Sequence, residues 1–174
     1  ARELPAELLL LQRNPPSSGT PRPELVYLQG ARFATFSEIN EGRKIDSAVL
    51  KNLSGGDKVS ARSLFSNKIK EFLPTHTIFL QANHRPEAPP DDTALWSRAV
   101  LIPFDTTFVE NPKGTQERKK DPLIEEKLAT EFEGILRWIV KGAIEYQKGG
   151  RCTPKEVRDA VEEYRNENDG IGEF

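Results

Sequence analysis

The chain has 174 residues, a net charge of −2, and 36% apolar and 30% charged residues. This length suffices for one domain with a buried core, and the small net charge excludes a protein that binds nucleic acid over its whole surface. No apolar run approaches the roughly 20 residues of a membrane-spanning helix. The single cysteine, Cys152, excludes an internal disulfide and a cysteine-rich zinc site. We therefore expect a chain from a reducing cytosol, with no membrane partner and no metal site built into it.

The spacing of apolar residues and the positions of turn residues predict the helices, strands and loops of the chain. Helical spacing is found at residues 4–12, 23–28 and 46–53 and, later in the chain, at 123–146 and 153–166. Compact β-prone runs predict buried strands at residues 32–36, 77–81 and 99–104. Residues 59–64 and 69–73 flank a polar turn and predict a β-hairpin, whereas residues 111–120 are polar and predict a surface loop.

Strands precede helices in this order. The pattern predicts an α/β fold, with a parallel-sheet core and a β-hairpin in residues 1–108. A linker loop and a C-terminal helical subdomain are expected in residues 109–174. Lys and Arg outnumber acidic residues in residues 43–70, whereas acids outnumber bases in residues 121–173. One local site for a polyanion is therefore expected.

Glu38 is the first candidate for a catalytic residue, because it stands where an apolar strand gives way to a polar loop. Ligands of open α/β sheets bind beyond the carboxyl ends of the strands. A carboxylate there can hold the water that attacks a phosphate, and the Ser37 hydroxyl can assist Mg²⁺. The alternative is a solvated strand-end acid with no role.

Asn83 follows the second predicted strand, and Arg98 lies just ahead of the third. The neutral amide of Asn83 suits the orientation of the same water or of a γ-phosphate, although Asn is also a common turn former. Arg98 can act as an arginine finger on the nucleotide of a neighbouring subunit. The alternative for Arg98 is a surface ion pair with Asp91 or Asp92, and Arg85 is a weaker rival for the finger role.

The predicted hairpin carries the candidate DNA-binding residues. Lys58, Lys68 and Lys70, with Phe65 near the tip, can contact a single strand through phosphates and one stacking ring. The alternative is a hairpin whose lysines only protect an exposed sheet edge from pairing.

In this order, the segments resemble the C-terminal ATPase of the phage and plasmid primase–helicase family. That family is related to the poxvirus primase-nucleoside triphosphatase, within superfamily 3 of the AAA+ helicases. Phe36-Ser37-Glu38, with the turn at residues 41–45, resembles the Walker B strand. Residues 50–57 and Ala61-Arg62 resemble the B-prime motif and its DNA-contacting hairpin. Its motif residues are Gly55, Gly56, Asp57 and Arg62.

The resemblance continues to the end of the chain. Residues 80–86 resemble motif C, with Asn83 as sensor 1, and residues 91–104 resemble the segment that carries the arginine finger. Residues 154–166 resemble the helix before a winged-helix region. The resemblance implies a partial AAA+ core, similar to the P-loop nucleoside triphosphatases, with Glu38, Asn83 and Arg98 as catalytic residues.

The implied parent protein is an ATP-dependent DNA helicase of phage, prophage or plasmid replication. Mg²⁺ and ATP are its expected cofactors. Its expected partners are single-stranded DNA, further copies in a hexameric ring and an N-terminal primase region of the same polypeptide. The expected location is the cytoplasm of a bacterial host cell.

The chain departs from the family at the phosphate-binding loop. That loop needs Gly followed by Lys, and no Gly precedes a Lys anywhere in the chain. The Walker A strand, loop and helix are expected before Ala1, so the isolated chain is expected to be inactive and to hold no tightly bound nucleotide. The alternative is a non-hydrolysing DNA-binding or ring-assembly remnant of a decayed prophage gene.

Overall fold

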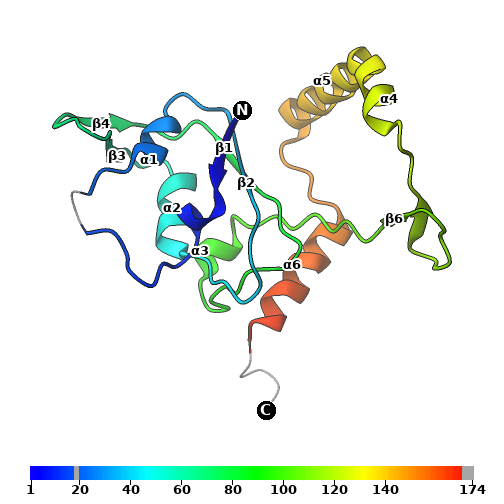
Figure 1. Ribbon diagram of the computed structural model, residues 1–174, viewed down its shortest axis with the longest axis horizontal. Coiled ribbons are helices and arrows are strands. Elements are labelled where there is room, and N and C mark those ends of the chain that lie inside the picture. Colours follow the sequence, from blue (N-terminus) through cyan, green and yellow to red (C-terminus); the bar gives the residue numbers. More distant parts are fainter. Residues whose placement is uncertain (18–19, 170–174) are drawn as a thin grey trace. The chain divides into compact units, whose positions relative to one another are not determined.

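The computed structural model describes residues 1–17 and 20–169. It divides into two compact units, which are described separately (Figure 1). Unit 1 comprises residues 1–99 and the chain from Val161 onward, and unit 2 comprises Val100–Ala160. The predicted boundary after residue 108 stays a prediction. Within the described ranges, no helix is both long and apolar enough to cross a membrane.

Unit 1 is built on a three-stranded parallel sheet. Its strands are β1 (Arg2–Pro5), β2 (Phe33–Ser37) and β5 (Thr77–Leu80), in the order β1-β2-β5. Strands are thus present at both predicted positions, 32–36 and 77–81, but the predicted burial was wrong for β5, which has no buried residue because it lies at the edge of the sheet in the described chain. Because all three strands are parallel, their carboxyl ends meet at one edge of the sheet.

The prediction of a helix over residues 4–12 was wrong. Residues 2–5 form β1, and the 3-10 helix η1 (Ala6–Leu9) follows. Leu8, Leu9 and Leu10 are all buried, so this apolar run faces the core on every side and does not follow the single stripe of a surface helix. Burial in the core therefore overrides the helical spacing that the sequence suggests.

The third predicted strand, at residues 99–104, was also wrong. These residues pair with no strand in the part of the chain that is described. Val100, Ile102 and Phe104 are exposed. Alternating apolar residues form a strand only beside a strand that accepts their backbone hydrogen bonds, and none lies here.

Two helices contribute buried residues to the core that lies against one face of this sheet. They are α1 (Pro23–Tyr27) and α2 (Ser47–Ser54), both at predicted positions. The Asp46 carboxylate caps α2 by accepting hydrogen bonds from two backbone N–H groups at its first turn. Phe36 lies at the centre of the core formed on this face and is fully buried. On the opposite face, Phe33 and Phe79 stack with ring centroids 4.0 Å apart and remain partly exposed.

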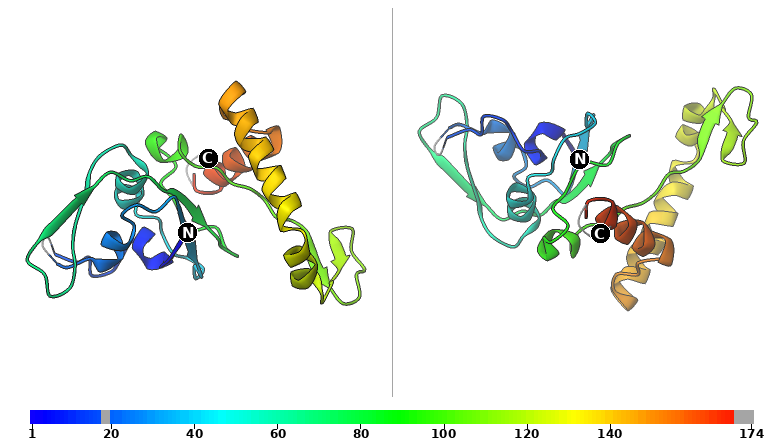
Figure 2. Two further views of the ribbon diagram at one scale, coloured as in Figure 1. Left: turned by 90° about the horizontal axis from the view of Figure 1, so that it is seen from above. Right: turned by 90° about the horizontal axis from the view of Figure 1, so that it is seen from below.

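The predicted hairpin is present. Strands β3 (Val59–Arg62) and β4 (Ile69–Phe72) pair antiparallel, with Val59 opposite Phe72. Val59, Ala61 and Phe72 belong to the core, which anchors the base of the hairpin. The hairpin itself projects from unit 1 (Figure 2).

Two further helices complete unit 1. Helix α3 (Thr93–Trp96) follows the loop after β5, and α6 (Lys155–Glu167) confirms the helix predicted over residues 153–166. From Val161 onward α6 belongs to unit 1. Its buried Tyr164 lies against Trp96 of α3, with ring centroids 5.1 Å apart.

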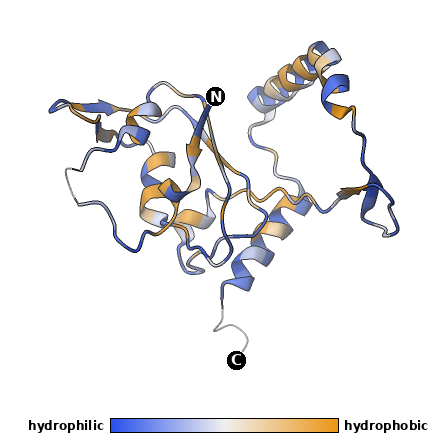
Figure 3. Ribbon diagram, in the orientation of Figure 1, coloured by the Kyte–Doolittle hydropathy of each residue, from blue (hydrophilic) through white to orange (hydrophobic). Residues whose placement is uncertain are grey.

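Unit 2 contains a small sheet and two helices. Strands β6 (Thr107–Val109) and β7 (Glu117–Lys119) pair in parallel, so the loop predicted at residues 111–120 contains a short strand. The single helix predicted over residues 123–146 is instead α4 (Ile124–Thr130) and α5 (Phe132–Gly149), separated at Glu131. Apolar residues recur along α5 (Figure 3). The whole chain is mixed α/β with a small parallel sheet, compatible with a core like that of P-loop proteins.

Candidate functional site

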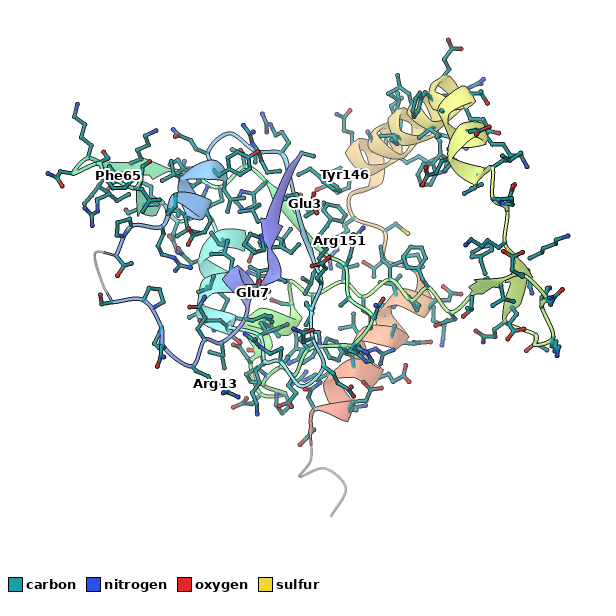
Figure 4. The ribbon with its side chains drawn as sticks, viewed as in Figure 1. Glu3, Glu7, Arg13, Phe65, Tyr146 and Arg151 are labelled. Atoms are coloured by element: carbon teal, nitrogen blue, oxygen red, sulfur yellow. The ribbon has the colours of Figure 1, made fainter. Side chains whose placement is uncertain are left out.

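An open cleft lies at the carboxyl ends of β1 and β2. Ser37, at the end of β2, and Glu38, which follows it, line this cleft. Glu3 of β1 and Glu7 of η1 line it as well (Figure 4). This is the edge at which parallel α/β sheets bind ligands. The predicted pair of Ser37 and Glu38 is therefore found at the mouth of a cleft.

Glu38 has an unusual backbone conformation. Its φ is +67°, in the left-handed region that a residue with a side chain adopts only at a cost. The following residue, Ile39, is buried, whereas the Glu38 side chain is exposed. The turn thus sends Ile39 into the core and leaves the carboxylate in solvent beside the cleft.

Asn83 lies beyond the carboxyl end of β5, the strand next to β2. Gln81 N–H donates to the Phe36 carbonyl at 2.8 Å, which continues the pairing of the two strands beyond β5. Asn83 follows two residues later and is exposed. Glu38 and Asn83 therefore follow neighbouring strands at the same edge of the sheet, although no hydrogen bond joins them.

Arg98 follows α3 and is exposed. Its Nη1 donates to the carbonyl of Ala94 at 2.5 Å, and it forms no ion pair within the described residues. The Asp92 carboxylate is instead 2.9 Å from the Lys51 ammonium. The ion pair with Asp91 or Asp92 that was the alternative for Arg98 is therefore not formed among the described residues. The rival candidate, Arg85, is engaged by the Glu167 carboxylate at 2.8 Å.

Asp92 connects α3 to α2. Its carboxylate accepts hydrogen bonds from Lys51 Nζ and from the backbone N–H of Leu95, and thereby caps α3. The bond from Lys51, followed by that from Leu95, lowers the pKa of Asp92. The carboxylate is therefore ionised at neutral pH, and the link between the two helices is present there.

The four predicted DNA-binding residues lie along the hairpin: Lys58 just before β3 at its base, Phe65 and Lys68 between the strands, and Lys70 in β4. Phe65, at the turn, is fully exposed and has a φ of +56°. Lys68 and Lys70 are exposed and form no ion pair in the described chain, whereas Lys58 Nζ is 3.9 Å from the Glu71 carboxylate. The ring of Phe65 therefore stands in solvent at the turn of the hairpin (Figure 4). Lys68 and Lys70 follow it along the chain, toward and in β4.

The motif residues before the hairpin have mainly structural surroundings. A side chain at Gly55 would place its Cβ 2.8 Å from the Lys51 carbonyl oxygen, so this position requires glycine. Gly56 has open space around it, and Asp57 is exposed. The Arg62 guanidinium donates to the Ser66 carbonyl at 3.4 Å and braces the hairpin turn.

Oxygen ligands at the cleft suit a hard cation. The Ser37 hydroxyl and the Glu38 carboxylate are groups that Mg²⁺ accepts. Within the described ranges, however, no three His, Cys, Asp or Glu residues are placed to hold a metal ion. A Mg²⁺ ion at this position would therefore depend on phosphate oxygens and water for its other ligands.

Sequence reasoning missed two groups of residues. Glu3 and Glu7 line the cleft, but the helix wrongly predicted there hid their position at a strand end. Tyr164 and Asn168 of the C-terminal region contact the loop after Asn83, and no local sequence signal marks contacts about 80 residues apart.

Comparison with known proteins identifies viral relatives. The chain is 31% identical over 180 residues to a protein of Acanthamoeba polyphaga mimivirus named "Putative helicase", an alignment that covers 98% of the chain and 19% of the relative. It is 28% identical over 170 residues to a protein of Frog virus 3 (isolate Goorha) that is also named a "Putative helicase", and the alignment covers 91% of the chain and 17% of that relative. A third relative, from Sputnik virophage, is 32% identical over 107 residues, and this alignment covers 61% of the chain and 14% of the relative.

The chain is thus similar to part of several viral proteins named as helicases. It spans less than a fifth of the length of each of these three relatives. No protein-family model matches the chain.

Proposed function

We propose that the chain is part of the ATPase core of a superfamily 3 DNA helicase that couples ATP hydrolysis to DNA unwinding. The observation that carries this proposal is the position of Glu38 at the carboxyl end of β2, beside the strand that leads to Asn83. The helicase names of the viral relatives support it.

In this proposal each candidate residue has a separate role. The Glu38 carboxylate holds and polarises the attacking water, and the Asn83 amide orients that water without competing for its proton. Arg98 reaches the nucleotide of a neighbouring subunit in a ring. Its exposure, and the absence of an ion pair to it in the described chain, leave the guanidinium available for a partner.

The hairpin is the proposed contact with single-stranded DNA. Lys68 and Lys70 neutralise phosphates, and the Phe65 ring stacks on a base. Lys58 contributes less in this proposal, because Glu71 already lies near its ammonium.

The parent protein supplies what this chain does not carry. We propose that its phosphate-binding loop, the Mg²⁺–ATP site completed by that loop, and a primase region belong to the parent polypeptide, and that six copies form the ring. Strand β5 is the last strand of its sheet in the described chain, and its outer edge can accept a further strand. Phage or plasmid replication in the cytoplasm of a bacterial host remains an expectation.

The experiment measures ATP turnover by the purified parent protein with Mg²⁺, with and without single-stranded DNA. Glu38→Gln should lower turnover by roughly two orders of magnitude or more, because it removes the group that polarises the water. Glu41→Gln is the matched control, since Glu41 is also an exposed carboxylate just after β2, and it should leave turnover unchanged. A parent protein that binds DNA but never hydrolyses ATP would support the remnant alternative instead.

A further inference from the structure

Residues 86–90 run from the candidate sensor Asn83 toward the candidate finger Arg98, and backbone bonds hold one side of this segment. Glu87 N–H donates to the Arg43 carbonyl, and the Glu87 carbonyl accepts from Ile45 N–H, both at 2.8 Å. The Lys44 ammonium also lies 2.7 Å from the Glu87 carboxylate. This side of the segment is therefore fixed to the turn that follows Glu38.

Helix α6 holds the other side of the same segment. Tyr164 Oη donates a hydrogen bond to the Pro86 carbonyl. Asn168 Oδ1 accepts from the Ala88 N–H at 2.8 Å. Arg165 Nε donates to the carbonyl of Pro90, also at 2.8 Å. Two side chains of α6 and one from Asn168, the residue just after it, thus satisfy three backbone groups of this proline-rich segment.

The contacts of α6 reach both ends of the connection between Asn83 and Arg98. Arg85, two residues after Asn83, pairs with Glu167. At the other end, Trp96, two residues before Arg98, lies edge-on to the Tyr164 ring. The Trp96 indole N–H also donates to the Pro89 carbonyl at 2.8 Å, so α3 is tied to the segment as well.

We propose that the C-terminal half of α6, with Asn168 just after it, is a positioning element that sets the placement of Arg98 relative to Asn83, with Tyr164 and Asn168 as its positioning residues. This inference rests on the proposed function. Tyr164 and Asn168 touch neither nucleotide nor DNA in this scheme. They act through the segment and α3, so a shift of α6 changes the angle at which Arg98 reaches the neighbouring subunit.

The first part of the test concerns the contact itself and needs no helicase activity. Exchange of the Ala88 amide hydrogen is followed by NMR in the chain. Asn168→Leu removes the acceptor and should accelerate that exchange about tenfold or more, whereas Asn168→Asp keeps an acceptor oxygen and should preserve protection. Glu162→Gln, on the same helix and exposed, is the control. Unchanged Ala88 exchange in Asn168→Leu would overturn the inference.

The second part separates kcat from KM in the parent protein. Tyr164→Phe keeps the ring but loses the bond to the Pro86 carbonyl, and small misplacements of a catalytic group cost up to ~100-fold in rate. We expect kcat for ATP to fall about tenfold with KM within about twofold, and Asn168→Asp to retain more activity than Asn168→Leu. If both Tyr164→Phe and Asn168→Leu have the kcat of the wild type, this inference is overturned but the proposed function still stands. A wild-type parent without ATP turnover would overturn the proposed function and this inference with it.

Discussion

Removal of Lys68 and Lys70 together should weaken single-strand binding in a salt-dependent manner. Both ammonium groups are exposed on the hairpin and have no acidic partner in the described chain. Each phosphate contact with a single strand contributes about 0.7 to the slope of log affinity against log salt, so Lys68→Ala/Lys70→Ala should lower that slope by about 1.4. Extrapolated from 1 M to 0.1 M salt, this corresponds to about 25-fold weaker binding at 0.1 M.

The matched control removes the same charge from another basic segment. Lys119 and Lys120 are also exposed and free of ion pairs among the described residues. The double variant Lys119→Ala/Lys120→Ala should change the slope little. Lys58→Ala should reduce single-strand affinity less than Lys68→Ala or Lys70→Ala does, because Glu71 already lies 3.9 Å from the Lys58 ammonium.

Fluorescence anisotropy of a labelled oligothymidylate, titrated with the chain at several salt concentrations, measures these slopes. If the Lys119/Lys120 variant loses as much affinity as the hairpin variant, or if the slope of the hairpin variant equals that of wild type, the hairpin is not the DNA contact. Circular dichroism of each variant confirms that it is folded.

Three further predictions concern single residues. Phe65→Gly should leave the free energy of unfolding nearly unchanged, because glycine accepts the φ of +56°, but should cost about 1–3 kcal/mol of single-strand affinity in the same anisotropy assay; equal affinity would exclude stacking. Glu38→Gly should stabilise the chain to urea by about 1 kcal/mol through relief of the left-handed backbone while abolishing turnover of the parent; a destabilised variant would contradict the strain. Burial lowers the pKa of His76 from 6.5, so below pH 6.5 the unfolded chain binds a proton that the folded chain excludes. The stability of the chain to urea should therefore decrease as the pH is lowered below 6.5, and the stability of His76→Leu should decrease less steeply. Parallel pH profiles of the two proteins would refute this cause.

The strands of the sheet are predictable from the sequence where a β-prone apolar run also finds a neighbouring strand to pair with in the fold. β2 and β5 are short apolar runs that end in polar residues, and both form parallel strands as predicted. The hairpin was also predictable, because its two β-prone runs flank a polar turn. These successes placed Glu38 and Asn83 at the same edge of the sheet.

The failures have one physical cause: long-range packing decides the outcome. Leu8 and Leu9 have helical spacing, but the chain before them pairs with β2 and buries them as a 3-10 turn. Similarly, the alternation at residues 99–104 found no strand to pair with. The contacts of Tyr164 and Asn168 join segments about 80 residues apart, and a single sequence carries no signal for such pairs.

The central claim is that Glu38 and Arg98 belong to one active site formed between two subunits. The most direct test mixes two inactive forms of the parent protein, Glu38→Gln and Arg98→Ala, and measures ATP turnover of the mixed rings. An exposed ion pair contributes only ~0–1 kcal/mol, so loss of a surface contact at Arg98 could not abolish turnover in a folded ring. The account predicts that each variant alone is inactive and that mixing restores part of the activity, at interfaces that combine an intact Glu38 with an intact Arg98. Confirmed mixed rings without recovery, or an Arg98→Ala protein with normal turnover, would contradict it.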